Sequence, residues 1–413
     1  MAHKDQRLGG IISIQLSIMM FLQFFVWGAW YVTMGPFMSN AEMNAKTIGW
    51  AYTVGPIAAI ISPFFLGLVA DRYFATERVL GVLHVLGGGF LCLAPMAAEQ
   101  SPSMFIVVIL LHMLCYMPTL GLSNTLALHN MTNAEKQFPL IRVFGTVGWI
   151  IANLVISKLA YDVSANMFYL AGGAGLLLGV YSFFLPHTPA PSKGQKFSAR
   201  DALGIDAISL LKDRSFAVFA LCSFLLCIPL AAYYSFAGQF VGESGFEKIA
   251  STMSTGQMSE IVFMLVMPFF FKRWGVKWML AVGMLAWVIR YGLFATAADD
   301  NIKWMVLSGI MLHGICYDFF FVTGQIYTDQ ASGAKIRGQA QGFLVLITQG
   351  LGMLIGAQLS GRLVARFTET VDDVSVVDWK QVWMYPAVFS AVILVIFVLL
   401  FKSKPKIAAA ESE

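Results

Sequence analysis

Long apolar runs dominate this chain and constrain its fold more than any other feature. Each is close to the ~20 residues that a helix needs to cross the hydrocarbon core of a bilayer. They are too long and too uniformly apolar to be strands of a membrane barrel, which alternate in hydropathy over about ten residues. The sequence therefore predicts an all-α polytopic membrane protein with twelve transmembrane helices, at 11–36, 48–70, 77–97, 103–127, 139–160, 164–185, 215–240, 253–272, 276–297, 303–327, 338–362 and 381–402.

Composition agrees with a membrane location. Of the 413 residues, 58% are hydrophobic and 12% are charged, whereas soluble proteins carry about 25% charged residues. The first run is too long for the apolar core of a signal peptide and no A-x-A site follows it, so we expect it to persist as a helix. We expect no cofactor. We also expect no metal site and no disulfide framework, because the five cysteines lie within apolar runs without metal-site spacing: Cys92, Cys115, Cys222, Cys227 and Cys316.

The basic residues of the connecting segments indicate the orientation. When both termini are placed inside, the inner segments hold 18 of the 27 Lys and Arg residues and the outer segments hold seven. Basic residues accumulate on the cytoplasmic side of membrane proteins, so the sequence predicts that both termini are cytoplasmic. The net charge of +4 then reflects topology in a lipid bilayer and does not indicate nucleic-acid binding.

One connection differs from the others and divides the chain. The segment "LPHTPAPSKGQKFSARDALGIDAISLLKDR" separates the sixth run from the seventh. The predicted parts are an N-terminal six-helix half at 1–185, a cytoplasmic linker at 186–214, a C-terminal six-helix half at 215–402 and a cytoplasmic tail at 403–413. Two six-helix halves around a site near the bilayer midplane form the plan of the major facilitator fold.

The turn after the second run supports this plan. It reads "GLVADRYFATER" and contains Gly67, Asp71 and Arg72. It resembles the loop between helices two and three of the major facilitator superfamily. That resemblance implies that these three residues belong to the conformational switch between the two access states. The corresponding turn of the second half, "FKRWGVKW", lacks the aspartate. A plain basic cytoplasmic turn remains the alternative interpretation of the motif.

Polar side chains inside apolar runs are candidate functional residues, because they are costly in lipid. In four runs they share helix faces with aromatic residues at helical spacing. We expect Asp318 to share a stripe with Phe321 and Gln325, beside a second stripe that carries His313 and Tyr317. The other candidates are Gln23, Trp27 and Trp30 in the first run, Arg142, Thr146 and Trp149 in the fifth, and Gln257 and Glu260 in the eighth.

Electrostatics connects three of these residues. Arg142, Glu260 and Asp318 would be very costly if each faced lipid, but they become tolerable in a water-filled cavity where they pair. Burial favours a protonated carboxyl group and a nearby arginine favours a charged one, so a carboxylate under both influences can exchange protons near neutral pH. Glu260 and Asp318 are therefore predicted to couple transport to protons. A static buried ion pair between two helices is the alternative.

Aromatic residues on the same faces indicate the kind of ligand. Trp27, Trp30, Trp149 and Tyr317 all lie on polar stripes. Flat aromatic walls with a few hydrogen-bonding groups suit a planar base or the apolar face of a sugar ring. Arg290, near the outer end of the ninth run, is instead expected to snorkel or to pair structurally.

At these residues the chain resembles one family. "FLQFFVWGAWYVTMG", "FPLIRVFGTVGW", "QMSE", "YDFF" and "IRGQAQGF" are similar, in order, to the nucleoside:proton symporters (nucleoside permeases) of the major facilitator superfamily. The resemblance implies proton-driven uptake of nucleosides across the bacterial inner membrane. It assigns the family's site pattern to Arg142, Thr146, Gln257, Glu260 and Asp318, with aromatic walls at Trp149 and Tyr317, where the family permease has phenylalanines.

Other positions depart from the family pattern. Ala231 and Tyr234 stand where the family has a Gln and an Asn, and His313 replaces a tyrosine. Pro229 lies in the same run as Ala231 and Tyr234, so a register slip is an open alternative there. We expect Tyr234 and His313 to bind the substrate and to alter its selection, because exchanging a hydrogen-bonding group changes discrimination strongly.

The sequence leaves alternatives to nucleoside symport open. These are a carrier of the same fold for a sugar or another hydroxylated ring compound, an uncoupled facilitator or exporter, and a membrane sensor. An enzyme is not expected, because we find no paired catalytic residues and no nucleotide-binding loop in a strand–turn–helix context. We expect a monomer.

Overall fold

The computed structural model describes residues 9–66, 71–190, 198, 204–372 and 374–402. These residues form helices and one short antiparallel hairpin, in which Thr368 pairs with Val377. The first part of the chain forms α1 (Gly10–Gly28), α2 (Met34–Asn40), α3 (Ala45–Phe65), α4 (Asp71–Tyr73), α5 (Thr76–Gln100), α6 (Pro102–His129), α7 (Ala134–Lys158) and α8 (Asn166–Ser182). The second part forms η2 (Ile205–Lys212), α10 (Arg214–Glu243), α11 (Ile249–Ala297), α12 (Lys303–Met311), the π-helix η3 (Ile315–Val322), α13 (Thr323–Val345), the π-helix η4 (Leu346–Gly352), α14 (Met353–Arg366), β1 (Thr368–Val371), β2 (Val374–Val377) and α15 (Trp379–Leu400).

The helices confirm the predicted class of membrane protein, although several helices begin and end at other residues than the predicted runs. Among the described residues, ten helical segments are long and apolar enough to cross a membrane. One of these segments, α11, has 49 residues and contains two of the predicted runs. The predicted run at 164–185 corresponds to the shorter helix α8, which has 17 residues. The chain reverses within α11 at Gly275 (φ 65°) and within α13 at Gly333 (φ 67°). Glycine adopts these positive φ values without the steric penalty that a side chain incurs.

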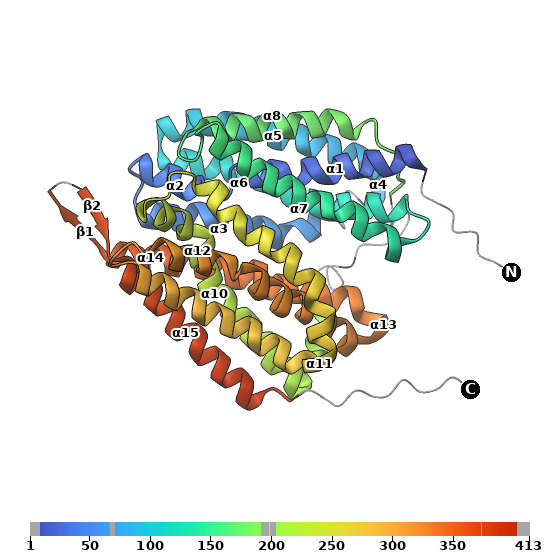
Figure 1. Ribbon diagram of the computed structural model, residues 1–413. Coiled ribbons are helices and arrows are strands. Elements are labelled where there is room, and N and C mark those ends of the chain that lie inside the picture. Colours follow the sequence, from blue (N-terminus) through green and yellow to red (C-terminus); the bar gives the residue numbers. More distant parts are fainter. Residues whose placement is uncertain (1–8, 67–70, 191–197, 199–203, 373, 403–413) are drawn as a thin grey trace.

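Two bundles form the molecule. Helices α1, α3 and α5–α8 pack with one another, and α10–α15 form the second bundle (Figure 1). Within the first bundle α1 and α7 approach closely at Gly148. A side chain at this position would clash with the backbone of Phe21, so the absence of one permits the contact. Small residues allow this kind of backbone contact between membrane helices. The contact fixes the relative position of the two first-bundle helices that carry the candidate site.

Contacts between the bundles gather at one end of the molecule. The amide of Gln358 on α14 donates to Thr53 Oγ1 on α3 at 2.7 Å. At Gly49 of α3 a Cβ would lie 2.7 Å from the carbonyl oxygen of Ala357, and at Gly35 of α2 a Cβ would lie 2.6 Å from that of Ser235. These backbones meet near the β1–β2 end, whereas the bundles diverge toward the opposite end, where α1 begins and α15 ends (Figure 1).

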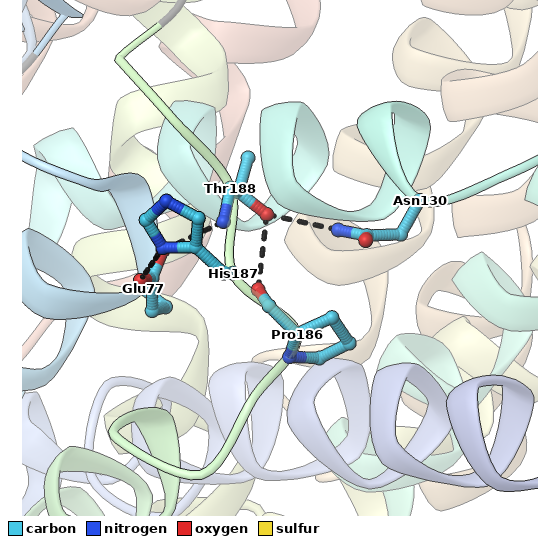
Figure 2. A network of polar contacts seen from close by, with 5 residues as sticks. All are labelled: Glu77, Asn130, Pro186, His187 and Thr188. Atoms are coloured by element: carbon cyan, nitrogen blue, oxygen red, sulfur yellow. Dashed lines mark hydrogen bonds and ion pairs between the residues drawn. The ribbon is translucent and has the colours of Figure 1, made fainter.

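The start of the linker is fixed to the first bundle. The carboxylate of Glu77, at the start of α5, is 2.8 Å from His187 Nδ1 and accepts a hydrogen bond from the Thr188 amide at 3.0 Å (Figure 2). The hydroxyl of Thr188 accepts from Asn130 Nδ2 at 2.9 Å and donates to the carbonyl of Pro186 at 3.1 Å. The quoted "LPHTP" segment therefore ties the start of the linker to α5 and to the end of α6.

Candidate functional site

A cavity of about 250 Å³ lies between the two bundles. This is slightly smaller than the ~300–1,000 Å³ of typical small-molecule sites. First-bundle helices α1 and α7 form one side and second-bundle segments form the other. The lining residues are Phe24, Trp27, Tyr31, Arg142, Thr146, Trp149, Tyr234, Gln257, Glu260, His313, Tyr317, Phe321, Gln325, Leu344, Val345, Thr348, Gln349 and Met353. Nine of the twelve substrate-binding residues predicted from sequence are among them: Trp27, Arg142, Thr146, Trp149, Tyr234, Gln257, Glu260, His313 and Tyr317.

Aromatic rings form a continuous wall of this cavity. Trp27 packs edge-on against Trp149, with 5.5 Å between ring centroids, and against Tyr31 at 5.4 Å. Tyr31 continues to Tyr234 of the second bundle at 5.9 Å. The Trp149 backbone can lie close to α1 because Gly28 has no side chain to fill the space. The contacts of Trp27 with Trp149 and with Tyr31 are edge-to-face, a geometry that aromatic pairs prefer. The tilted contact between Tyr31 and Tyr234 joins this wall to the second bundle.

Arg142 contributes a positive charge from the first bundle. Its guanidinium lies 4.1 Å from the ring centroid of Phe24, which holds it by a cation–π contact. Gly145 leaves the space for this arrangement, because a Cβ there would lie 2.6 Å from both Arg142 Nη1 and the Phe24 ring. Thr146 lines the cavity on the next position of α7.

Glu260 contributes a negative charge from the opposite side. Its side chain is 14% exposed, and one carboxylate oxygen lies 3.9 Å from His313 Nε2. The charges of Arg142 and Glu260 interact electrostatically. Within the described part of the chain, however, no ion pair shorter than 4.0 Å joins them. The two opposite charges therefore face a shared cavity and are not locked in a direct pair.

The π-helix η3 alters the stripes expected from an ordinary helix. His313, Tyr317, Phe321 and Gln325, each four residues apart, all line the cavity. In an α-helix, with about 3.6 residues per turn, side chains four residues apart move steadily around the helix axis. A π-helix, with its i→i+5 hydrogen bonds, has more residues per turn, so this displacement is offset and the four side chains stay on one face. The expectation that Phe321 and Gln325 would share a face with Asp318 is wrong for this reason.

Asp318 does not line the cavity. Its side chain is fully buried, and neither carboxylate oxygen has a hydrogen-bond partner among the described residues. Its charge interacts with that of Glu260, and it precedes Phe319 and Phe320, which are also buried. A carboxyl group in such surroundings is costly when charged. Asp318 is therefore placed behind the cavity, within electrostatic reach of Glu260.

Two other predicted substrate-binding residues also lie outside the lining. The side-chain amide of Gln23 donates to Thr119 Oγ1 at 2.7 Å, and its oxygen is 2.8 Å from His84 Nε2. Trp30 is fully buried and packs against His112 at 5.4 Å. Helix α1 ends at Gly28, so Trp30 leaves the stripe that a continuous helix would have given it. The hydrogen-bonding groups of Gln23 are satisfied within the first bundle.

Two further residues named in the sequence analysis, Ala231 and Arg290, do not line the cavity. Ala231 is buried against α14. A Cβ added to Gly356 of α14 would lie 2.7 Å from the Cβ of Ala231. Arg290 is fully buried, donates from Nε to the Gly309 carbonyl at 3.0 Å and lies 4.3 Å from the Tyr233 ring centroid. Its Nη1 and Nη2 atoms have no hydrogen-bond partner among the described residues. Snorkelling is excluded because the side chain does not reach the surface.

The predicted switch residues lie only partly in the described chain. Gly67 lies outside the described residues. Asp71 and Arg72 belong to the short helix α4, in which Arg72 is half-buried and the structure describes only the backbone of Asp71.

Sequence reasoning missed several polar cavity residues. Thr348 and Gln349 belong to "LITQGLG", the segment that forms η4 in the eleventh run. They are polar residues within an apolar run, so the rule that identified Glu260 could have found them. Phe24 and Tyr31 carried no such signal, because aromatic residues are abundant throughout this chain.

Fold and site together define a class of protein. Two six-helix bundles around a polar, aromatic cavity form a secondary transporter of the major facilitator type. The chain belongs to the nucleoside H+ symporter family, whose model matches residues 11–406. This is a family of transporters, and the chain is a multi-pass membrane protein of that family.

Individual relatives agree over nearly the full length. The chain is 40% identical to the putative nucleoside transporter YegT of Escherichia coli, over 94% of this chain and 93% of that protein. It is 34% identical to the xanthosine permease of the same organism, over 95% of this chain and 96% of that protein. The crystal structure of the nucleoside transporter NupG is similar with a TM-score of 0.85 and 31% identity, covering 95% of this chain and 100% of that one.

Proposed function

We propose that this protein takes up nucleosides together with protons, by alternating access around the cavity between its two bundles. The observation that carries the proposal is that Arg142 and Glu260 face the same aromatic cavity from opposite bundles. A ligand that contacts both charges connects the two bundles. Its binding can therefore be coupled to their relative movement and to the protonation of the carboxylate.

The chemistry of the lining suits a nucleoside. Trp27, Trp149 and Tyr317 offer flat surfaces against which a planar base can pack. The side-chain amide of Gln257 can both donate and accept hydrogen bonds from a base edge, and Thr146 and Glu260 can bind ribose hydroxyls. The same groups would also accept a sugar, which is why sugars belong in the substrate panel.

The proton is assigned to the two carboxylates of the second bundle. Glu260 reaches the cavity with 14% of its side chain exposed, whereas Asp318 is buried behind it. Their charges interact, so a single proton held by the pair relieves the repulsion between them. Glu260 then exchanges protons with the cavity, and Asp318 stabilises the protonated state of the pair.

The proposed orientation in the membrane follows from the distribution of basic residues. With both termini in the cytoplasm, the end where the bundles diverge faces the cytoplasm and the joined end faces outward. The chain then adopts an inward-facing state in a bacterial inner membrane. The halves 1–185 and 215–402 move relative to each other as a monomer, and Gly67, Asp71 and Arg72 act at the cytoplasmic end as the conformational switch.

Uptake into proteoliposomes tests this proposal. Purified protein is reconstituted, and labelled purine nucleosides, pyrimidine nucleosides and simple sugars are supplied under an imposed inward proton gradient. We expect nucleosides to accumulate above their equilibrium level and to stop accumulating when an ionophore collapses the gradient. Equal transport with and without the gradient would support an uncoupled facilitator. Accumulation of sugars alone would overturn the assigned substrate class.

A further inference from the structure

A small polar cluster joins the two bundles at their closed end. Asp162 lies in the connection between α7 and α8 of the first bundle and is 5% exposed. Its Oδ1 accepts hydrogen bonds from Ser157 Oγ at 2.8 Å and from the backbone amide of Ala250 at 2.7 Å. Ser157 Oγ in turn accepts from the backbone amide of Ser251 at 2.9 Å. Ala250 and Ser251 belong to the second bundle.

This cluster supplies a helix cap from another bundle. Helix α11 starts at Ile249, and its own N-cap residue, Lys248, makes no side-chain cap. The first amides of a helix have no partner within the helix and need acceptors. A capping side chain ordinarily serves the amides two and three positions after the cap. In this protein Asp162 and Ser157 serve those two amides, Ala250 and Ser251.

The cap depends on the conformational state. The Oδ1–amide and Oγ–amide distances of 2.7 and 2.9 Å require that the end of α7 lies directly against the start of α11. If this end opens, all bonds between the bundles in the cluster break together. The amides of α11 then exchange a carboxylate for water and lose the favourable interaction of a negative charge with the helix N-terminus.

We infer that Asp162 and Ser157 form a latch that stabilises the state closed at this end and slows its opening during the transport cycle. The inference rests on the proposed alternating-access function and assigns it two residues outside the ligand cavity. The latch acts by capping α11 across the bundle interface, not by contacting the substrate. Its removal should favour the state that opens at the β1–β2 end.

Distance measurements between paramagnetic labels test the latch. Labels are attached at Glu99→Cys, at the end of α5, and Asp300→Cys, just after α11, which are exposed positions at the closed end of opposite bundles. The partly exposed Cys92 and Cys115 are first replaced by serine. Wild type, Asp162→Ala, Asp162→Asn and Ser157→Ala are compared in nanodiscs without substrate, after gel filtration confirms that each is folded.

We expect Asp162→Ala to add a longer distance and to raise the open-to-closed ratio roughly 5- to 30-fold, as the loss of a cap worth one or two kcal/mol would. Ser157→Ala and Asp162→Asn should each give a smaller increase, because part of the hydrogen bonding remains. Glu369→Gln is the matched control, since Glu369 is an exposed carboxylate on the hairpin at the same end.

The inference is overturned if folded Ser157→Ala and both Asp162 variants keep the wild-type distance distribution. Should Asp162→Ala fail to fold, Asp162→Asn and Ser157→Ala decide the matter. The measurement uses no substrate and no proton gradient. A failure of nucleoside transport and a failure of the latch are therefore distinguishable.

Discussion

Arg142 of α7 and Glu260 of α11 line the same cavity from opposite bundles without forming a direct ion pair. Each of these charges lies in a largely apolar helix and has a large cost of burial. A ligand and a proton can change how each is compensated. This relationship is the physical basis for coupling binding, protonation and bundle movement in one site.

The first prediction concerns the two carboxylates. Glu260→Gln and Asp318→Asn each remove a negative charge with little change of shape, so gradient-driven accumulation should fall at least about tenfold, equivalent to about 1.4 kcal/mol of lost coupling. Counterflow exchange, which needs no net proton movement, should fall less. Both rates are measured in the same proteoliposomes. Wild-type accumulation by both variants would show that neither residue couples transport to protons.

The second prediction concerns the short helix α4. Asp71→Ala should slow turnover about tenfold if the switch interaction is worth about 1.4 kcal/mol. Apparent substrate affinity should stay nearly unchanged, because α4 contributes no residue to the cavity lining. Initial rates at several nucleoside concentrations separate the two effects. A large loss of affinity with normal turnover would contradict the assigned role.

The third prediction concerns substrate selection by His313. This residue lines the cavity, stacks on Tyr233 at 5.9 Å and on Tyr317 at 6.0 Å, and approaches Glu260. His313→Tyr should change the ratio of affinities for purine and pyrimidine nucleosides by about tenfold or more, because it exchanges a hydrogen-bonding group in the site.

Competition assays with a nucleoside and sugar panel measure this ratio. The control is His129→Tyr, which makes the same substitution at an exposed position at the end of α6. An unchanged order of substrates with unchanged affinities in His313→Tyr would mean that His313 does not select the ligand.

The fourth prediction concerns the packing of α1 on α7. A methyl group at Gly148 would collide with the Phe21 backbone, so Gly148→Ala must push apart two helices that line the cavity. Such overpacking typically costs about 1–3 kcal/mol of stability. Thermal unfolding in detergent should therefore show a lower Tm. Gly173→Ala in α8 is the matched control, because a Cβ there meets nothing within 4 Å; an equal effect of both substitutions would contradict the packing argument.

The sequence predicted the membrane class and most of the cavity for physical reasons. Hydropathy identifies segments that must lie in lipid, and charged groups such as Arg142 and Glu260 must then face the protein interior. The π-helix could not be predicted, because it depends on how the surrounding helices pack. For that reason Phe321 and Gln325 were assigned to the wrong stripe. Gln23 was predicted to bind substrate, but it lies in a buried hydrogen-bond network with Thr119 and His84. A polar side chain in an apolar run can be satisfied either by such a network or by a ligand, and the sequence does not distinguish the two.

The latch at Asp162 was also beyond sequence reasoning. Asp162 lies in a connection between runs, where a carboxylate is unremarkable. Its contact becomes visible only when the fold brings it to the α11 amide of Ala250, 88 positions away. Contacts between the bundles depend on long-range topology, which local patterns do not encode.

Simultaneous recording of proton and nucleoside movement tests the central claim most directly. Proteoliposomes containing a pH-sensitive dye receive a nucleoside outside, with no initial pH gradient and with the membrane potential clamped by potassium and valinomycin. The account predicts that nucleoside entry acidifies the lumen, and that Glu260→Gln greatly reduces this acidification per nucleoside transported. Nucleoside entry at the wild-type rate without any lumenal acidification would contradict proton symport.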